Sequence, residues 1–119
     1  MDVPQPGPEA PEEAILILPA DGREVYRLVR NEPASSQDFQ PRYGKAAAFA
    51  AGVTELRRQG LSHYLERGDA EEVNEQDSML ARVRLEPGYF DFARTGPQRG
   101  HLDVWGRVDH FVQFAETEE

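Results

Sequence analysis

The chain is organised around the stretch Gly100-His101-Leu102-Asp103-Val104-Trp105-Gly106. This stretch holds the only Trp of the chain and one of its three His. Successive side chains of an extended strand point to opposite faces, so His101, Asp103 and Trp105 share one face and the two aliphatic residues share the other. The aliphatic pair, Leu102 and Val104, predicts a side that packs in a core. The polar and aromatic set predicts a face that is free to serve another purpose.

The pattern on either side of this stretch predicts an α+β domain with a mostly antiparallel, twisted sheet of about six to seven short strands and two helices. We expect strands at residues 14–18, 24–30, 61–65, 79–85, 89–94, 101–105 and 110–114. Helical spacing of apolar residues predicts one helix at residues 45–59, and a shorter acidic helix is expected at residues 69–77.

Local signals assign the connections. Asp-Gly in the turn at residues 19–22 predicts that the first two strands form a hairpin, and the continuous apolar run at 14–18 predicts a strand buried on both sides. Gly60 is expected to cap the first helix. Asp69, with a Glu three residues later, resembles a capping box that opens the second helix. Pro87 followed by Gly predicts a type II turn.

Length and charge predict a single domain at residues 14–115, with a disordered, acidic and Pro-rich lead at 1–13 and an acidic tail at 116–119. The net charge is −9, from 22 acidic and 13 basic residues. Residues 14–114 contain 15 of the acids and all 13 bases, so the body is close to neutral. The acidity therefore lies mostly at the two ends, which is typical of solubility-promoting segments.

Composition excludes several classes of function. The absence of Cys rules out disulfides, thiol chemistry and Cys-type zinc sites. Arg57-Arg58 and the pair Arg82 and Arg84 do not form a basic stripe, so we expect no nucleic-acid binding. The apolar run at 14–18 is too short for a membrane span or for the core of a signal peptide. We therefore expect a cytoplasmic protein that does not associate with a membrane. The sequence does not indicate its oligomeric state.

Three possibilities for chemistry follow from the residues. His101 and Asp103, with Asp109-His110 nearby, are acceptable metal ligands, but their spacing matches no defined motif and we expect no metal site. Ser62 and His63 are adjacent and face opposite ways on a strand. Ser62 could pair with His101 only if their strands are neighbours, and no nucleophile elbow or phosphate loop is present.

Arg27 lies mid-strand between two valines, where a charged residue requires a partner or a ligand. The alternative interpretation is an edge strand in which the side-chain stem packs on the sheet while the guanidinium stays in water. Trp105 has two interpretations as well, a core or rim aromatic residue and a stacking platform for a ligand.

The order of short motifs resembles a family of small uncharacterised bacterial proteins. The resemblance covers residues 24–106 and rests on Tyr26-Arg27, Asp38-Phe39, Gly60-Leu61-Ser62-x-Tyr64, Ala81-x-Val83-x-Leu85 and Gly100-His101-x-x-Val104-Trp105-Gly106. It implies no defined activity.

The same order is also similar to the small ADP-ribosyltransferase-like plan, which implies an NAD cofactor. In that plan Arg27 and either Ser62 or Tyr64 would hold NAD. The Glu expected on a late strand is absent from residues 100–106, where only His101 and Asp103 are available. The resemblance therefore implies either an altered transferase or a degenerate relative that binds without catalysing.

Two functional hypotheses result. The first is a small cytosolic binding or regulatory protein, such as an immunity or antitoxin-like protein, whose partner is another protein and which needs no cofactor. The second is an ADP-ribosyltransferase-like enzyme or nucleotide binder, so whether the chain is an enzyme stays open. The ligand-binding candidates are Arg27, Ser62, Tyr64, His101, Asp103 and Trp105, and the catalytic candidates among them are Arg27, Ser62 and Asp103. The two hypotheses differ in whether these residues converge on one cleft.

Overall fold

The computed structural model describes residues 16–40, 59–73, 78–95 and 98–117. Within these ranges the chain forms seven strands in one sheet, two α-helices and a short 3-10 helix, η2. The strands are β1 (Leu18–Pro19), β2 (Glu24–Val29), β3 (Leu61–Tyr64), β4 (Met79–Arg84), β5 (Phe90–Arg94), β6 (His101–Gly106) and β7 (Ala115–Thr117). The helical elements are η2 (Ser36–Phe39), α3 (Arg67–Glu72) and α4 (Val108–Phe114). The predicted α+β class with an antiparallel sheet is confirmed.

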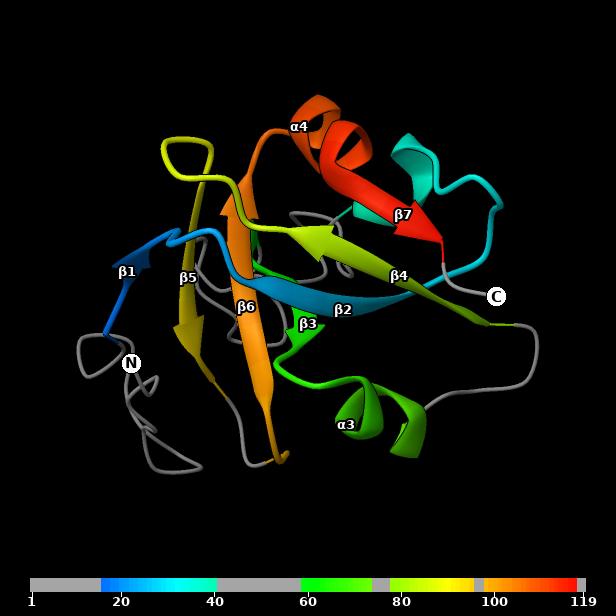
Figure 1. Cartoon of the computed structure of the whole chain (residues 1–119), viewed down its shortest axis with the longest axis horizontal. Coiled ribbons are helices and arrows are strands. Elements are labelled where there is room, and N and C mark those ends of the chain that lie inside the picture. Colours follow the sequence, from blue (N-terminus) through cyan, green and yellow to red (C-terminus); the bar gives the residue numbers. More distant parts are fainter. Residues whose placement is uncertain (1–15, 41–58, 74–77, 96–97, 118–119) are drawn as a thin grey trace, which may run out of the picture.

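The sheet curls back on itself. Its strand order is β1-β5-β6-β3-β2-β4-β7, and every neighbouring pair is antiparallel. β1 and β2 are separated by only four residues along the chain, yet they occupy the first and fifth places in this order. Two backbone hydrogen bonds hold the connection between β1 and β2 against other strands. The N–H of Ala20 donates to the carbonyl of Phe90 at 3.0 Å, and the N–H of Gly22 donates to the carbonyl of Leu85 at 2.8 Å. The strands therefore form a partly closed barrel, in which the β1–β2 connection crosses in front of β5 and β6 (Figure 1).

The core fills the inside of this curled sheet. Leu102 and Val104 are fully buried, as their alternation along the strand predicts, and so are Val25 and Val83 on the opposing strands. The predicted inward set of β4 is largely confirmed, because Ala81, Val83 and Leu85 have no exposed surface and Met79 packs against the core.

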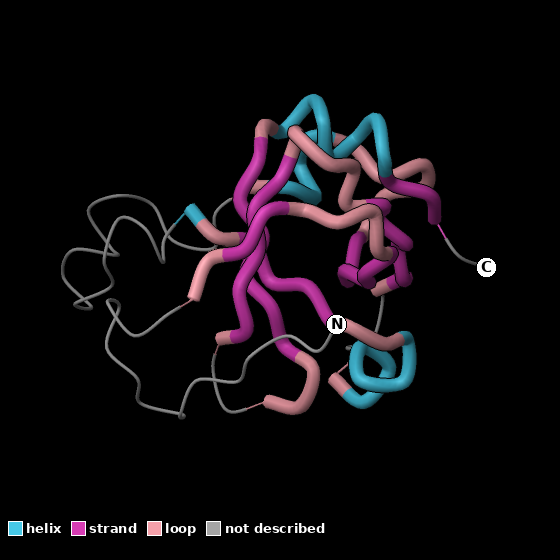
Figure 2. The backbone as a smooth tube through the Cα atoms, turned by 60° about the vertical axis from the view of Figure 1, so that its left-hand side comes forward, coloured by secondary structure: helices cyan, strands magenta, loops and turns pink. Residues whose placement is uncertain are grey.

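One end of the barrel is covered by α4 and η2, which lie together. α3 lies on the opposite side of the molecule (Figure 2), where its Ala70 belongs to a second apolar cluster that is separate from the main core. The strand predicted at 110–114 is wrong, because these residues belong to α4. Val108, Phe111 and Phe114 recur every three residues, which brings them to one side of a helix. Phe111 is fully buried and stacks on Phe39 of η2 with ring centroids 5.2 Å apart.

The first strand also differs from the prediction. β1 pairs with β5, and β2 pairs with β3 and β4, so the predicted hairpin between the first two strands does not form. Gly22 does adopt a positive φ of 88°. Gly22 lies in the segment that connects β1 to β2 across the barrel. Leu16 and Ile17 are 51% and 41% exposed, so the described part of the 14–18 run is not buried on both sides.

Two further boundaries are corrected. α3 begins at Arg67, two residues before the predicted start, and Glu66 precedes it without a side-chain cap; Asp69 lies in its first turn and forms no capping box. Glu116, which we assigned to the acidic tail, is paired with Arg82 as part of β7. The side chain of Glu116 accepts a hydrogen bond from that arginine at 2.8 Å, which explains why an acidic residue continues the sheet.

The remaining predictions are confirmed or lie outside the described residues. Gly88 has a φ of 89°, and the N–H of Tyr89 donates to the carbonyl of Glu86 at 3.2 Å, as a type II turn at Pro87-Gly88 requires. The helix predicted at 45–59, apart from its last residue, and the lead at 1–13 lie outside the described residues. None of the described helices is long and apolar enough to cross a membrane.

Candidate functional site

Strands β3 and β6 place most of the predicted site residues on one face of the sheet. Ser62 lies opposite Asp103, and Tyr64 lies opposite His101. Directly opposed residues of antiparallel strands point to the same face. Trp105 follows Asp103 by two residues and therefore shares this face, which we call the polar face. The other face of the same strands, the core face, carries Leu61, His63, Leu102 and Val104.

Arg27 does not belong to the polar face. Tyr26 pairs with Tyr64, so Tyr26 shares the polar face and its neighbour Arg27 points to the core face. Its Nε donates to the backbone carbonyl of Asp38 at 2.7 Å, and its Nη1 donates to that of Ser62 at 2.8 Å. The predicted convergence of Arg27 with the hydroxyl and imidazole groups is therefore wrong, because the register of β2 on β3 turns the arginine away.

Arg27 instead joins η2 to the sheet. Its guanidinium lies over the ring of Phe39 at 5.5 Å from the centroid. Burial lowers the pKa of Arg27 to about 10, and the negative charges of Asp38 and Asp103 oppose this change, so the group stays cationic at neutral pH. The alternative of an edge arginine with its head in water is wrong as well, since β2 is paired on both sides.

Ser62 and His101 form a hydrogen-bonded pair on the polar face. The Oγ of Ser62 lies 3.0 Å from Nε2 of His101. Nδ1 of the same ring lies 3.0 Å from the backbone carbonyl of Thr95 and 3.0 Å from the hydroxyl of that residue. Ser62 is exposed, whereas Thr95 is buried. β3 and β6 are therefore neighbours in the sheet, which was the condition for a pair between Ser62 and His101.

Tyr64 forms a wall beside the imidazole. Its ring contacts that of His101 edge-on, with centroids 5.4 Å apart. Its hydroxyl donates to Oε1 of Gln98 at 3.1 Å. Burial raises the pKa of Tyr64, and the charge of Arg27 partly opposes this. The phenol therefore stays protonated and keeps its hydrogen bond to Gln98.

Gly60 allows the start of β3 to approach β6 closely. A Cβ at position 60 would lie 2.8 Å from the Cβ of Asp103 and 3.1 Å from Cε2 of Trp105. Such distances leave no room for a side chain. The sequence suggested a helix cap at Gly60, but the contact with Asp103 and Trp105 is what requires a glycine here.

A groove of about 400 Å³ lies at the end of β5 and β6. Its floor is a cross-strand row in which Pro19 pairs with Asp91 and Asp91 pairs with Trp105. Tyr89 and His110 stand beside this row with ring centroids 4.6 Å apart. We call this the Trp105 groove; it is lined by Pro19, Gly88, Tyr89, Phe90, Asp91, Trp105, Gly106, Arg107 and His110.

Of this groove, the sequence pointed to Trp105 as a ligand-binding candidate and to His110 only as a possible metal ligand. The other lining residues come from β1, the turn before β5, the start of β5 and the end of β6, and their adjacency depends on strand order. One local signal was available: Tyr89 follows the Pro-Gly turn directly, and a large aromatic residue at a turn is a candidate for an exposed contact. Its side chain is 42% exposed.

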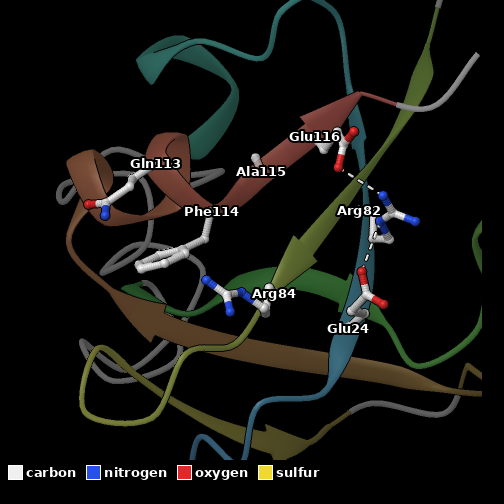
Figure 3. Close-up of a pocket in the computed structure, with 7 residues that line it drawn as sticks. All are labelled: Glu24, Arg82, Arg84, Gln113, Phe114, Ala115 and Glu116. Atoms are coloured by element: carbon white, nitrogen blue, oxygen red, sulfur yellow. Dashed lines mark hydrogen bonds and ion pairs between the residues drawn. The ribbon is translucent and has the colours of Figure 1, made fainter.

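A second groove lies between β4, β7 and α4 (Figure 3). Arg82 is held there by Glu24 at 2.9 Å and by Glu116 at 2.8 Å. Arg84 pairs with Glu86 at 3.0 Å and lies over the ring of Phe114. Because both cations already have acidic partners, this groove is explained by the attachment of β7 and α4 to the sheet.

No group of three or more potential ligands that could hold a metal ion occurs in the part of the chain that the structure describes. Comparisons of the chain with protein-family models, with curated proteins and with solved structures found no match. The polar face and the Trp105 groove are therefore the two candidate sites among the described residues.

Proposed function

We propose that the chain is a small binding protein of the immunity or antitoxin type, which holds another protein through the Trp105 groove. The observation that carries this proposal is the gathering of Tyr89, Trp105, Arg107 and His110 around one open depression. Tyr, Trp and Arg are the residue types that most often dominate the energy of protein interfaces. They come from two stretches that are distant in the sequence, one at Tyr89 and one at residues 105–110.

The charge of the chain indicates the chemistry of the partner. A net charge of −9 favours the approach of a basic protein and disfavours acidic ones. The groove itself is close to neutral, because its lining includes one acidic residue, Asp91, and one arginine, Arg107. We therefore propose a partner with a basic surface that inserts an apolar or aromatic side chain between Tyr89 and Trp105.

The position of Arg27 favours this proposal over the ADP-ribosyltransferase-like alternative. A nucleotide site on the polar face would need a cation for its phosphates. The arginine that the sequence offered for this role donates to two backbone carbonyls on the core side. A binding protein has no need to bring Arg27 together with Ser62 and His101.

The proposal is tested by measuring affinity for the products of neighbouring genes, purified separately, by isothermal titration calorimetry. We expect one partner to bind, and Tyr89→Ala to weaken binding about tenfold or more, as an interface residue worth about 1.4 kcal/mol would. Binding should also weaken as salt rises, because exposed charges are screened.

Val112→Ala is the matched control. Val112 is also an exposed large apolar residue, at 36%, and lies two positions after His110 on α4. Two residues correspond to about 200° around a helix, which turns Val112 away from the groove. A partner that binds Tyr89→Ala as tightly as the wild type, or that loses equal affinity with Val112→Ala, would place the interface elsewhere.

A further inference from the structure

We propose that Ser62 is a nucleophilic serine activated by His101, and that it accepts the acyl group of small, uncharged, activated carboxylic esters. This activity is independent of the Trp105 groove. It rests on three features of the polar face: the hydrogen-bond contacts of His101, the exposure of Ser62 and the carboxylate of Asp103 opposite it.

The contacts of Nδ1 in His101 indicate the direction of the bond with Ser62. The carbonyl of Thr95, 3.0 Å from Nδ1, can only accept, whereas the hydroxyl of Thr95, also at 3.0 Å, can either accept or donate; we therefore assign the proton to Nδ1, the tautomer that satisfies both contacts. In the neutral ring Nε2 then carries the lone pair and accepts the proton of Ser62 Oγ at 3.0 Å. Ser62 is therefore the donor, which is the arrangement that a general base needs in order to activate a hydroxyl.

The imidazole is held from two sides. Thr95, which is 1% exposed, anchors Nδ1 from the end of β5, and the edge-on ring of Tyr64 limits rotation. Thr95 also donates its N–H to the carbonyl of His101 at 3.3 Å, so the anchor is part of the sheet. An orienting group behind the base is the third member of a hydroxyl–imidazole arrangement, here a carbonyl in place of a carboxylate.

The reaction follows from these positions. Ser62 Oγ attacks the ester carbonyl carbon while its proton passes to Nε2 of His101. The bond to the leaving alcohol or phenol then breaks, and that group takes the proton from Nε2. The product is an ester of Ser62, which water hydrolyses when His101 removes its proton, releasing the carboxylic acid and restoring the serine.

Asp103 limits the class of acyl donor. It lies directly opposite Ser62 in the register, and its negative charge also supports the cationic state of Arg27. A carboxylate beside the nucleophile repels anionic donors such as phosphate esters or acyl groups with free carboxylates. Uncharged esters do not meet this repulsion, so they are the donors that the site admits.

The test is incubation of the full chain with p-nitrophenyl acetate at pH 7.5, followed by intact mass measurement and peptide mapping. Few other side chains compete with Ser62 for the acetyl group, because the chain has no Cys and Lys45 is its only lysine. We expect an acetyl group on Ser62 and release of p-nitrophenol. Ser62→Ala should abolish the adduct, and His101→Gln should slow its formation about 100-fold or more, since general base catalysis contributes at least that factor.

Ser36→Ala is the control, because Ser36 is an exposed serine on η2. It should acetylate and release p-nitrophenol like the wild type. Release of p-nitrophenol that is unchanged in Ser62→Ala, equal labelling of Ser36 and Ser62, or an unchanged rate in His101→Gln would each overturn the proposal. Urea midpoints of Ser62→Ala and His101→Gln show whether the variants fold; if His101→Gln does not, the contrast between Ser62 and Ser36 in the wild type decides.

Discussion

His63 and His101 lie on neighbouring strands and point to opposite faces of the same sheet. His63 is fully buried and stacks on Phe111, and its Nδ1 donates to the carbonyl of Leu61 at 2.9 Å. Its Nε2 has no hydrogen-bond partner among the described residues. His101 is partly exposed and has a partner at each ring nitrogen. Alternation along two strands therefore makes one histidine a core side chain and leaves the other available for chemistry.

The difference has an electrostatic consequence. Burial lowers the pKa of His63 to about 3, and the charge of Arg27 adds to this effect. His63 is thus neutral throughout the physiological range and cannot act as a general acid. The core face uses its polar groups for architecture, whereas the polar face keeps Ser62 and His101 accessible at the surface.

Phe111→Ala should be the most damaging change. Phe111 is fully buried and its ring contacts Phe39, His63 and Phe90 at centroid distances of 5.2, 5.5 and 4.8 Å. Removing a buried Phe leaves a cavity and should lower the free energy of unfolding by about 3–5 kcal/mol, measured by urea denaturation. A loss below about 1 kcal/mol would show that α4 is not part of the core.

The sequence predicted the fold class because alternation is a local signal. It assigned Leu102 and Val104 to the core correctly. It failed at α4, because a short segment with three apolar residues, such as 110–114, does not distinguish a strand from a buried helix. It also failed at the first two strands, where the Asp-Gly turn favoured a hairpin that the pairing of β1 with β5 replaced.

The candidate site was predictable only within one pair of strands. Ser62, His101 and Asp103 share a face because β3 pairs with β6 in one register, and alternation already placed two of the three together. Arg27 was misplaced because no sequence pattern fixes how β2 is aligned on β3, and a shift by one residue exchanges the two faces. The Trp105 groove depends on strand order in the same way.

His63 predicts a dependence of stability on pH. Its pKa is about 3 in the folded state, against an ordinary value of 6.5 for a histidine exposed to water, so the unfolded chain binds the proton first as pH falls. The free energy of unfolding should therefore fall as pH drops below 6.5, by about 2 kcal/mol between pH 7 and pH 5. In His63→Leu this fall should largely disappear. An equally steep fall in the variant would assign the effect to other groups.

Asp38→Asn should have a smaller effect in a lower pH range. Burial would raise the pKa of Asp38, but hydrogen bonds from the N–H groups of Arg30 and Ser35 and from Asn31 outweigh it, so the pKa is lowered. A lowered carboxyl pKa stabilises the fold above the unfolded value near 3.8, and this contribution is lost as pH falls through the folded value.

At pH 7 we therefore expect Asp38→Asn to cost about 1–2 kcal/mol, since an amide replaces a charged acceptor of several hydrogen bonds. The difference between variant and wild type should shrink below pH 4, when the wild-type carboxyl is protonated as well. Denaturation curves at pH 7 and pH 3 check this, and a difference that stays constant over this range would mean that charge on Asp38 contributes nothing.

Ser62→Ala should have the smallest effect on stability, because Ser62 is an exposed residue of the polar face. The substitution removes the hydroxyl of Ser62 and one hydrogen bond with it. The ring of His101 is partly exposed, so its Nε2 can accept a hydrogen bond from water instead. We expect the free energy of unfolding to change by less than about 0.5 kcal/mol, as for most surface substitutions. A loss of 2 kcal/mol or more would mean that the Ser62–His101 bond holds β3 to β6. The polar face would then be as structural as the core face, and the bond would need no chemical role to explain it.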